Sequence, residues 1–475
     1  MGSYFFCGIG GSGMLPLALI LTGQSVKITG SDRSYDQGRT PKKFEWLKSQ
    51  GIEIVPQDGK SLTTDYEALI ISSAIEDSIP EVAKAKDLGI PIIKRAELLA
   101  SLFNKARISI AIGGTSGKST TTGMLTWIMF EAQKDPTVMN GANFLNFVSP
   151  ARPYASSLVG DPDLFVSECD ESDGSIILYH PTIAVLNNIA LDHKPIEDLV
   201  PIFRTFLFQS QKQVLNLQNE TISEQLADEF SATAITTGIN HPSADLNVTN
   251  YAPTATGSSS TIEDRRGKQS YTLILKVPGK HNIENALSAL GAAIQAGIEL
   301  EQAVKALETF SGVKRRLENI GNYNNINVID DFAHNPDKVK ASLSTCNEHF
   351  GRLLIMFQMH GYGPLKLMKD DLICAFVDGM KSGDILYMPD VLYLGGATDK
   401  SYTSRDFINE INERGGIKNI KGEWLETREG ILAKLVNEAR AGDRIIIMGA
   451  RDDTLSTFAQ DVLTSLQNHA RNSQS

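Results

Sequence analysis

Cysteines, clusters of basic residues and long apolar runs are all scarce in this sequence. Its four cysteines are scattered without a paired CxxC spacing, which argues against both a zinc site and a disulfide framework. Acidic residues outnumber basic ones by 56 to 45, and no dense run of Lys and Arg occurs, so nucleic acid is not an expected partner. No segment approaches the roughly 18 uninterrupted apolar residues of a membrane-spanning helix, so no membrane partner is expected either.

The N-terminus also lacks the features of a targeting signal. Residues 5–21 are rather apolar, but no basic segment precedes them, and several glycines and Pro16 interrupt them. Phe6 occupies the position at which N-myristoylation requires Ser or Thr. Together with the scattered cysteines, these absences predict a cytoplasmic protein.

What the sequence does contain is an α/β pattern that repeats over a long chain. Its 475 residues are too many for one hydrophobic core, because single domains hold about 100 to 200 residues. Short apolar strands alternate with helical segments, which is typical of parallel sheets covered by helices. The pattern restarts twice and predicts three α/β domains, at residues 1–104, 105–313 and 314–475.

The predicted elements follow the short apolar runs. A hairpin over residues 246–277, around a Ser/Thr/Gly-rich loop at 254–261, is expected at the edge of the second sheet. Helices are expected at 42–50, from Lys118 onward and at 428–441. The other strands are expected at residues 4–7, 25–29, 68–72, 91–93, 108–112, 164–167, 182–186, 328–330, 353–357, 385–388 and 444–448.

A glycine-rich turn between a strand and a helix gives the strongest chemical signal. Glycines let backbone N–H groups curl around phosphate oxygens, Lys118 would reach the β- and γ-phosphates, and the Ser119 hydroxyl would bind Mg²⁺. Ile112 replaces the first glycine of the full pattern, so the loop is of a shorter kind. A chance Lys-Ser pair after a glycine turn is the alternative, which the order of strand, loop and helix disfavours. The predicted phosphate-binding residues are Gly114, Thr115, Ser116, Gly117, Lys118, Ser119 and Thr120.

Acidic residues follow the next predicted strands. Glu168 stands directly after residues 164–167, and Asp192 and His193 stand after residues 182–186. Carboxyl ends of parallel strands meet at the edge where ligands bind, so Ser119, Glu168 and His193 are predicted to hold Mg²⁺. Glu171, in the same acidic run as Glu168, is expected to be an ordinary solvated carboxylate.

A second glycine turn lies near the N-terminus. Its residues Gly8, Gly10, Gly11, Ser12 and Gly13 follow a strand, and Asp32 comes about 20 residues later. This pattern resembles a dinucleotide fingerprint, in which glycines admit a diphosphate and the acid binds a ribose hydroxyl. An NAD(P)-dependent oxidoreductase is therefore one alternative, although it leaves the phosphate loop at Lys118 without a purpose. A nucleotide-binding regulator without turnover is another.

Taken in order along the chain, the motifs resemble those of the bacterial Mur ligases, the enzymes that add amino acids to peptidoglycan precursors. The resemblance covers nearly the whole chain and is closest to the branch that joins L-alanine to UDP-N-acetylmuramate. The matching segments are GIGGSGM at 8–14, GSD at 30–32, KRAELL at 94–99, GTSGKSTTT at 114–122, ECDESD at 168–173, NNIALDH at 187–193, PGKHN at 278–282, KRRL at 314–317 and DDFAHNP at 330–336.

The resemblance implies a fold and a reaction. It implies a Rossmann-like N-terminal domain for the UDP-sugar, a central ATPase domain and a Rossmann-like C-terminal domain that closes over ATP and the amine. ATP, with Mg²⁺, would convert the sugar carboxylate into an acyl phosphate that a small amino acid then attacks. The protein would be a monomer or a weak homodimer. The alanine-adding branch works without a carbamylated lysine, and none is assigned here.

The resemblance also implies roles for individual residues. Catalysis would fall to Lys118, Glu168, His193 and Arg316. Beyond the phosphate loop, ATP would contact Asn282, Asn285, Arg316 and Asp331, and the UDP-sugar would contact the N-terminal glycine turn, Asp32 and Ser73.

The departures from the alanine-adding pattern concern the acceptor. Residues 332–334 and 186–188 look closer to the member that attaches a tripeptide in peptidoglycan recycling, and residues 358–363 replace a stretch rich in His and Arg. The candidate amino-acid-binding residues are His334, Asn335 and Arg451. L-alanine or a similarly small amino acid is the predicted acceptor, with the tripeptide as the alternative.

Overall fold

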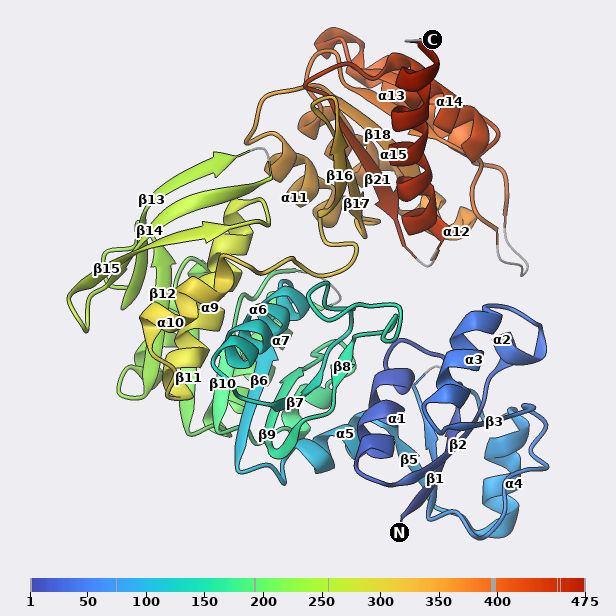
Figure 1. The fold of residues 1–475 in the computed structure, drawn as a ribbon, viewed down its shortest axis with the longest axis vertical. Helices are drawn as coiled ribbons and strands as arrows, with labels where there is room; N and C mark the ends of the chain where they lie inside the picture. Colours follow the sequence, from blue (N-terminus) through green and yellow to red (C-terminus); the bar gives the residue numbers. More distant parts are fainter. Residues whose placement is uncertain are drawn as a thin grey trace. The chain divides into compact units, whose positions relative to one another are not determined.

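Within the described residues, the computed structural model forms three α/β sheets with helices packed against them (Figure 1). It describes residues 2–73, 75–191, 194–254, 256–393, 399–450, 452 and 454–473. Internal contacts divide the chain into two compact units. Unit 1 comprises Met1–Tyr251, Ser260–Ile274 and His281–Val313, and unit 2 comprises Ala252–Ser259, Leu275–Lys280 and Lys314–Ser475.

The first sheet is parallel, in the order β3-β2-β1-β4-β5. The side chains of its central strand β1 point alternately to the two faces of the sheet. Phe6 packs against α1 and α3, whereas Phe5 and Cys7 pack on the opposite face with α4. The expected strands are confirmed, but the second begins two residues late because Ser25 adopts a left-handed φ of 64°. The elements are β1 Ser3–Cys7, α1 Met14–Gly23, β2 Lys27–Ser31, α2 Arg33–Asp36, α3 Pro41–Ser49, β3 Glu53–Val55, β4 Ala68–Ile71, α4 Pro80–Leu88, β5 Ile92–Lys94 and α5 Arg95–Phe103.

The second sheet runs in the order β15-β14-β13-β12-β11-β10-β6-β9-β7-β8. Strands β12 to β7 in that order are parallel, and the short edge strand β8 is antiparallel. The elements are β6 Ile108–Gly113, α6 Lys118–Glu131, β7 Pro136–Met139, β8 Ser157–Leu158, β9 Asp161–Glu168, η1 Ser175–Leu178, β10 Ile183–Leu186, α7 Ile196–Phe208, β11 Lys212–Asn216, α8 Glu220–Gln225, η2 Ala227–Phe230, β12 Ala234–Ile239, β13 Leu246–Thr254, β14 Gly257–Asp264, β15 Gln269–Leu275, α9 Lys280–Gln295 and α10 Leu300–Leu307.

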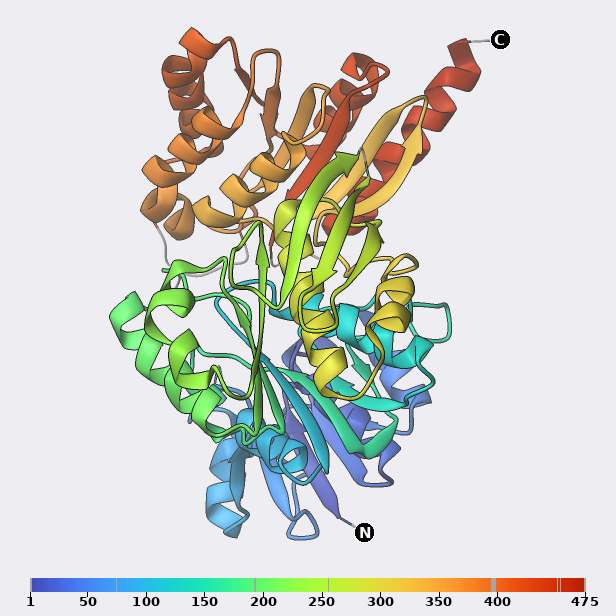
Figure 2. The same cartoon turned by 90° about the vertical axis from the view of Figure 1, so that its left-hand side faces the viewer.

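One prediction for this sheet is wrong. The Ser/Thr/Gly-rich segment 254–261 is not a loop but largely belongs to strand β14, so β13, β14 and β15 stand side by side where a hairpin was expected (Figure 2). Ser258, Ser260 and Ile262 are buried, and the residues between them are only partly buried. Burial thus alternates every two residues, as in a strand, but the alternating side chains are mostly small hydroxyl residues. An analysis of apolar residues alone does not detect this alternation.

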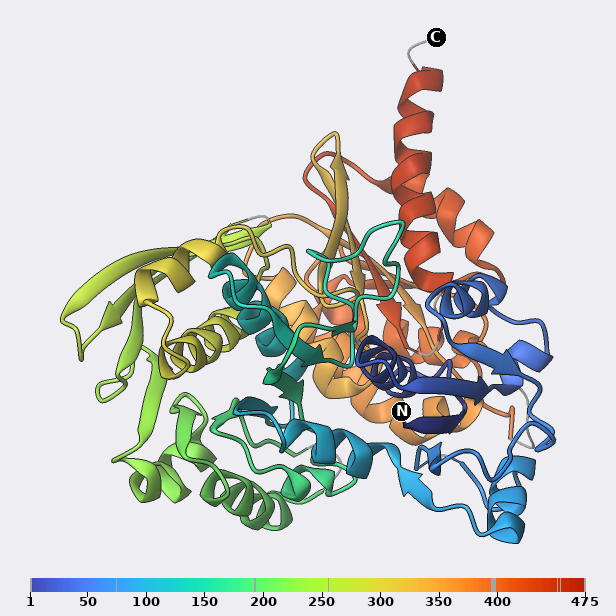
Figure 3. The same ribbon diagram turned by 60° about the horizontal axis from the view of Figure 1, so that its bottom comes forward.

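The third sheet runs in the order β16-β17-β21-β18-β19-β20, parallel apart from the antiparallel edge strand β16. Helices α11, α12 and α13 cover one face, and α14 and α15 cover the other. Helix α15 runs toward the C-terminus (Figure 3). The elements are β16 Glu318–Tyr323, β17 Ile326–Asp331, α11 Pro336–Cys346, β18 Leu353–Gln358, α12 Tyr362–Gly379, β19 Ile385–Met388, α13 Ser404–Gly415, η3 Gly416–Lys418, β20 Lys421–Trp424, α14 Arg428–Glu438, β21 Arg444–Gly449 and α15 Thr454–Ser473.

Two further features bear on the sequence predictions. All four cysteines are free thiols, three of them buried, which confirms that no disulfide framework is present. Among the described helices, none combines the length and the apolar character needed to cross a bilayer.

Candidate functional site

The predicted phosphate loop connects β6 to the N-terminus of α6. Gly117 caps that helix with a left-handed φ of 78° and without a side-chain hydrogen bond. A Cβ at this position would lie 2.2 Å from the Asn285 Oδ1 atom, so only glycine fits there. The N–H groups in the first turn of a helix have no partner within the helix, so this end presents the kind of donors that an anion requires.

Asn188, just after β10, fixes the shape of the loop. Its Oδ1 accepts hydrogen bonds from the Thr115 hydroxyl at 2.8 Å and the Ser116 N–H at 2.9 Å, and its Nδ2 donates to the Ser116 carbonyl at 3.1 Å. Sequence reasoning assigned Asn188 no role. The signal that could have found it is the pair of asparagines directly after a buried strand.

The Lys118 ammonium points back into the protein. Its Nζ donates to the Gly114 carbonyl at 2.6 Å and to the Glu171 carboxylate at 2.7 Å. Glu171 is only 3% exposed, so the expectation that it is an ordinary solvated carboxylate is wrong. In this structure Glu171 neutralises the charge of Lys118, and phosphate oxygens would have to replace it.

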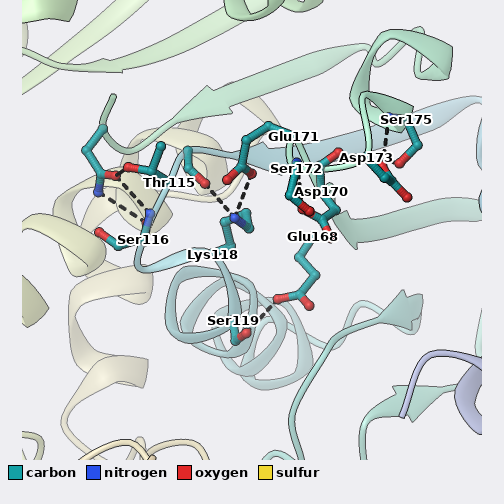
Figure 4. A network of polar contacts seen from close by, with 12 residues as sticks. Thr115, Ser116, Lys118, Ser119, Glu168, Asp170, Glu171, Ser172, Asp173 and Ser175 are labelled. Atoms are coloured by element: carbon teal, nitrogen blue, oxygen red, sulfur yellow. Dashed lines mark hydrogen bonds and ion pairs between the residues drawn. The ribbon is translucent and has the colours of Figure 1, made fainter. Parts of the chain in front are cut away.

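The reason for that error lies in the turns of the acidic loop. Asp170 accepts from the Ser172 N–H, and Asp173 accepts from the Ser175 N–H, each at 2.9 Å. These two carboxylates are exposed and stabilise turns, whereas Glu171 between them faces the lysine (Figure 4). Neighbouring acidic residues on one loop therefore have different partners, because the turns of the backbone point their side chains in different directions. Spacing in the sequence does not show these directions.

Two of the predicted metal ligands lie together at the end of the same helix. The Ser119 hydroxyl donates to Glu168 Oε2 at 2.6 Å, and Glu168 Oε1 lies so close to Gly141 that a Cβ there would approach it to 2.2 Å. A hydroxyl and a carboxylate are hard oxygen ligands that suit Mg²⁺. The third predicted ligand, His193, and its neighbour Asp192 lie outside the described residues, among which no group of three or more His, Cys, Asp or Glu could hold a metal.

Buried amides pack behind the phosphate loop. The Asn187 Nδ2 donates to the Thr121 hydroxyl at 2.9 Å, which donates to Asn285 Oδ1 at 3.3 Å, and the Asn285 Nδ2 donates to Asn282 Oδ1 at 3.1 Å. Asn282 and Asn285, predicted to contact the nucleotide, thus lie beside the loop. Thr120, predicted to bind ATP, is buried in α6.

The N-terminal glycine turn is held by the acid predicted to act with it. Asp32 Oδ2 accepts from the Gly10 N–H, and its Oδ1 accepts from the Ser34 N–H, both at 2.8 Å. Asp32 therefore shapes the turn and caps α2, and its contact with a ribose stays a prediction. Ser12 and Ser73 are exposed beyond the carboxyl ends of β1 and β4.

In unit 2, Asp331 ends strand β17 and is almost fully buried. Its Oδ1 accepts from the Leu317 N–H at 3.2 Å and the Phe332 N–H at 3.0 Å, and its Oδ2 accepts from the Ser342 hydroxyl. Burial raises the pKa of this carboxyl, and these hydrogen bonds oppose the rise. The Arg316 guanidinium lies 5.2 Å from the centre of the Phe332 ring.

The loop after β17 carries the other predicted acceptor residues. The His334 Nδ1 lies 2.8 Å from the Phe332 carbonyl oxygen, and its ring stands edge-on to His360, with centroids 5.7 Å apart. Asn335 caps α11, because its Oδ1 accepts from the Lys338 N–H at 2.9 Å. Arg451 lies outside the described residues.

Comparison with known proteins gives this arrangement a family. The model of the Mur ligase family catalytic domain matches residues 3–107, the Mur ligase middle domain 112–293, and the Mur ligase glutamate ligase domain 315–451. A UDP-N-acetylmuramate–L-alanine ligase of Rickettsia peacockii (strain Rustic) is 33% identical over 481 residues, which cover 96% of this chain and 93% of the relative. The chain belongs to the Mur ligase family.

Solved structures share the fold of this Mur ligase. A UDP-N-acetylmuramate-alanine ligase from Thermotoga maritima has a TM-score of 0.76 at 23% identity and covers 99% of this chain and 100% of its own. A murein peptide ligase from Psychrobacter arcticus has a TM-score of 0.66 at 25% identity and covers 98% and 99%. The predicted three-domain Mur ligase architecture, Rossmann-like at both ends with a central phosphate-loop domain, is confirmed.

One pH dependence of this Mur ligase follows from His334. Burial, together with the charges of Lys338, His360 and Arg316, lowers the pKa of its imidazole to about 4. Since the unfolded value is 6.5, the unfolded chain binds the proton first, and the contribution of a neutral His334 to stability is lost as the pH falls from 6.5 toward 4. Replacing His334 with Gln should therefore reduce the loss of unfolding free energy between pH 7 and 4.5 by about 2 kcal/mol.

Urea unfolding of the parent protein and of His334→Gln at the two pH values measures this difference. Equal losses in the parent and in His334→Gln would mean that the imidazole titrates as it does in the unfolded chain.

Proposed function

We propose that this Mur ligase is an ATP-dependent, ADP-forming ligase that joins the carboxylate of UDP-N-acetylmuramate to L-alanine or a similarly small amino acid. The observation that carries the proposal is the convergence of Lys118, Ser119 and Glu168 at the uncapped N-terminus of α6. The Rickettsia relative, which this chain matches over 93% of the relative's length, is named for this activity. The nucleotide-linked substrates and the free thiols favour the cytoplasm as the place where it acts.

The first step of the proposed reaction is phosphoryl transfer. The carboxylate oxygen of the sugar attacks the γ-phosphorus of ATP, its bond to ADP breaks, and an acyl phosphate forms. Lys118, released from Glu171, and the N–H groups of α6 would neutralise the charge on the phosphate oxygens. Mg²⁺, held by Ser119 and Glu168 with His193, would supply further neutralisation of that charge.

The second step joins the amine to the activated carbonyl. The amine of the acceptor attacks the acyl phosphate, loses a proton, and inorganic phosphate leaves. His334 suits a place beside that amine, because its Nδ1 is turned to the Phe332 carbonyl and a neutral ring then carries a lone pair on Nε2. Exclusion of water at this stage would protect the acyl phosphate from hydrolysis.

The remaining assignments follow from the same proposal. The glycine turn shaped by Asp32, together with Ser73, would bind the UDP-sugar. The residues that would contact ATP are Asn282 and Asn285 of unit 1 and Arg316 and Asp331 of unit 2. The domain boundaries at residues 104 and 313 and a monomeric or weakly dimeric state belong to this proposal as well.

The acceptor is the least constrained part. Residues 359–364 contain a single ionisable nitrogen group, His360. Arg315 and Arg428, which lie near this edge of the third sheet, direct their guanidinium groups to protein oxygens, so they are poor candidates for clamping a carboxylate. Arg451 would then be the clamp for the carboxylate of the amino acid. A tripeptide is the second candidate, favoured by the similarity to the Psychrobacter murein peptide ligase.

A panel of acceptors distinguishes these candidates. The enzyme is given UDP-N-acetylmuramate, ATP and Mg²⁺ with L-alanine, L-serine, glycine or the tripeptide, and phosphate release and product mass are followed. We expect turnover with L-alanine and a KM for L-alanine that rises in Arg451→Ala. Turnover with the tripeptide alone would contradict the alanine assignment, and an unchanged KM would contradict the carboxylate clamp.

A further inference from the structure

Arg428, the first residue of α14, lies at the carboxyl edge of the third sheet, and each of its three guanidinium nitrogens donates to a protein oxygen. Its Nε and Nη2 donate to Gln358 Oε1 at 2.9 and 2.8 Å, and its Nη1 donates to the Thr454 hydroxyl at 2.8 Å. Its Nη2 also pairs with the Asp452 carboxylate. One planar group thus joins the end of β18 to the loop that follows β21.

Gln358 extends this connection to a third strand. While its Oε1 accepts from Arg428, its Nε2 donates to the Asp390 carbonyl at 2.9 Å and to the Met359 carbonyl at 3.2 Å. Asp390 follows β19 and Met359 immediately precedes His360. The loops after β18, β19 and β21 are therefore tied to one another through two side chains.

Arg315 holds the backbone of the same region. Its Nη2 donates to the Gly449 carbonyl at 2.6 Å and its Nη1 to the Asp452 carbonyl at 3.2 Å, while its Nε lies 3.3 Å from Asp330. Asp452 is thus fixed through its backbone by Arg315 and through its side chain by Arg428. Arg315 thus anchors the backbone at both Gly449 and Asp452.

Stability alone does not account for this arrangement. The Arg428 and Asp452 side chains are 20% and 8% exposed, and an ion pair withdrawn from water to this extent gains little over well-packed apolar residues. The position does account for it, because ligands of open α/β sheets bind at the carboxyl ends of the strands. The tied residues also include Met359, next to His360, and Asp452.

We propose that Arg428, Gln358 and Asp452 form a positioning network that sets the affinity for the acceptor amino acid. The inference rests on the proposed function and deepens it, since it names the side chains that hold Met359, next to His360, and Asp452 in place. Arg428 does not touch the acceptor, because its donors are bound within the protein. It acts by holding these loops in place.

The test replaces Arg428 with Met, which keeps the length of the stem and removes the fork. Displaced loops should raise the KM for the acceptor at least about tenfold. A misplacement of reacting groups by about 1 Å can lower the reaction rate by up to about 10²-fold, so an effect of this size on the acceptor is reasonable. The KM values for ATP and UDP-N-acetylmuramate should stay within about twofold, because the partners of Arg428 include none of the residues proposed to contact either substrate. Acyl phosphate formed without acceptor, trapped with hydroxylamine, should match the parent.

The chain offers a matched control in Arg352→Met. Arg352 pairs with Asp443 at 2.7 Å, with exposures of 22% and 8%, and it joins the same strands β18 and β21 at their opposite, amino ends. Both variants lose an Arg–Asp pair of similar burial, so their thermal midpoints should fall alike. Only Arg428→Met should change the KM for the acceptor.

A conservative variant separates geometry from charge. Arg428→Lys can restore the ion pair with Asp452 but not the two bonds to Gln358, so its KM should lie between those of the parent and Arg428→Met. An acceptor KM that is unchanged in Arg428→Met, or raised equally in Arg352→Met, would overturn the network. A parent enzyme that ligates no acceptor would instead overturn the proposed function.

Discussion

Replacing Lys118 with Ala is expected to lower kcat by at least roughly 10²-fold, the scale seen when one preorganised donor to developing charge is removed. The ammonium stands at the uncapped end of α6, within hydrogen-bond distance of the loop carbonyl of Gly114. Phosphoryl transfer depends almost entirely on such charges, because the protein forms no covalent bond in it. Steady-state release of phosphate, with saturating substrates, measures the loss.

A lysine at the amino ends of the strands of the same sheet, opposite the phosphate loop, serves as a control for the loss of a positive charge. Lys212 begins strand β11, and its Nζ donates to the Gln295 carbonyl at 3.1 Å. Lys212→Met should leave kcat within about twofold, as expected for a substitution away from any functional group. Near-parental phosphate release in Lys118→Ala would remove the phosphate-loop assignment.

Replacing Glu168 with Gln is expected to raise the Mg²⁺ concentration needed for half-maximal activity by about tenfold or more, because a neutral amide is a weaker ligand for a hard cation than a carboxylate. Glu168 is the candidate ligand because its carboxylate lies 2.6 Å from the Ser119 hydroxyl, in the first turn of α6. Activity titrated with Mg²⁺ at fixed free ATP gives the measurement. At saturating Mg²⁺ part of the loss in rate should recover.

Asp173→Asn is the matched control, since it removes one charge from the same acidic loop. Asp173 is exposed and accepts a hydrogen bond from the Ser175 N–H, so its carboxylate stabilises a turn. Its Mg²⁺ requirement should equal that of the parent. If Glu168→Gln shares that requirement, Glu168 is not a metal ligand.

The phosphate loop was predictable because strand, glycine turn and helix follow one another within a few residues. Local order in the sequence translates directly into local structure there, and β6 and α6 lie where expected. Strands β16 and β20 were not predicted, because edge strands with sequences such as ENIGNY and KGEW present one exposed face and no apolar run. The buried strands β7, β11 and β12 were missed as well, because polar residues such as Thr137, Gln213 and Thr237 interrupt their short apolar runs.

The contacts of the site were less predictable than its residues. Glu171 and Glu168 stand three positions apart in one acidic run, and only the fold shows that the first pairs with Lys118 and the second with Ser119. Asn188 and Arg428 act through partners that are distant in sequence, such as Ser116, 72 residues away, and Gln358, 70 residues away. Such pairings depend on strand order, which spacing does not determine.

The most direct test of the central claim follows an oxygen atom. UDP-N-acetylmuramate labelled with ¹⁸O in its carboxylate is incubated with the enzyme, ATP, Mg²⁺ and L-alanine, and the released phosphate is analysed by mass spectrometry. If the carboxylate attacks the γ-phosphate and the amine then displaces phosphate, one carboxylate oxygen passes to each phosphate, and phosphate from fully labelled substrate carries one ¹⁸O. Unlabelled phosphate, released while the sugar keeps both labels, would contradict the acyl-phosphate route.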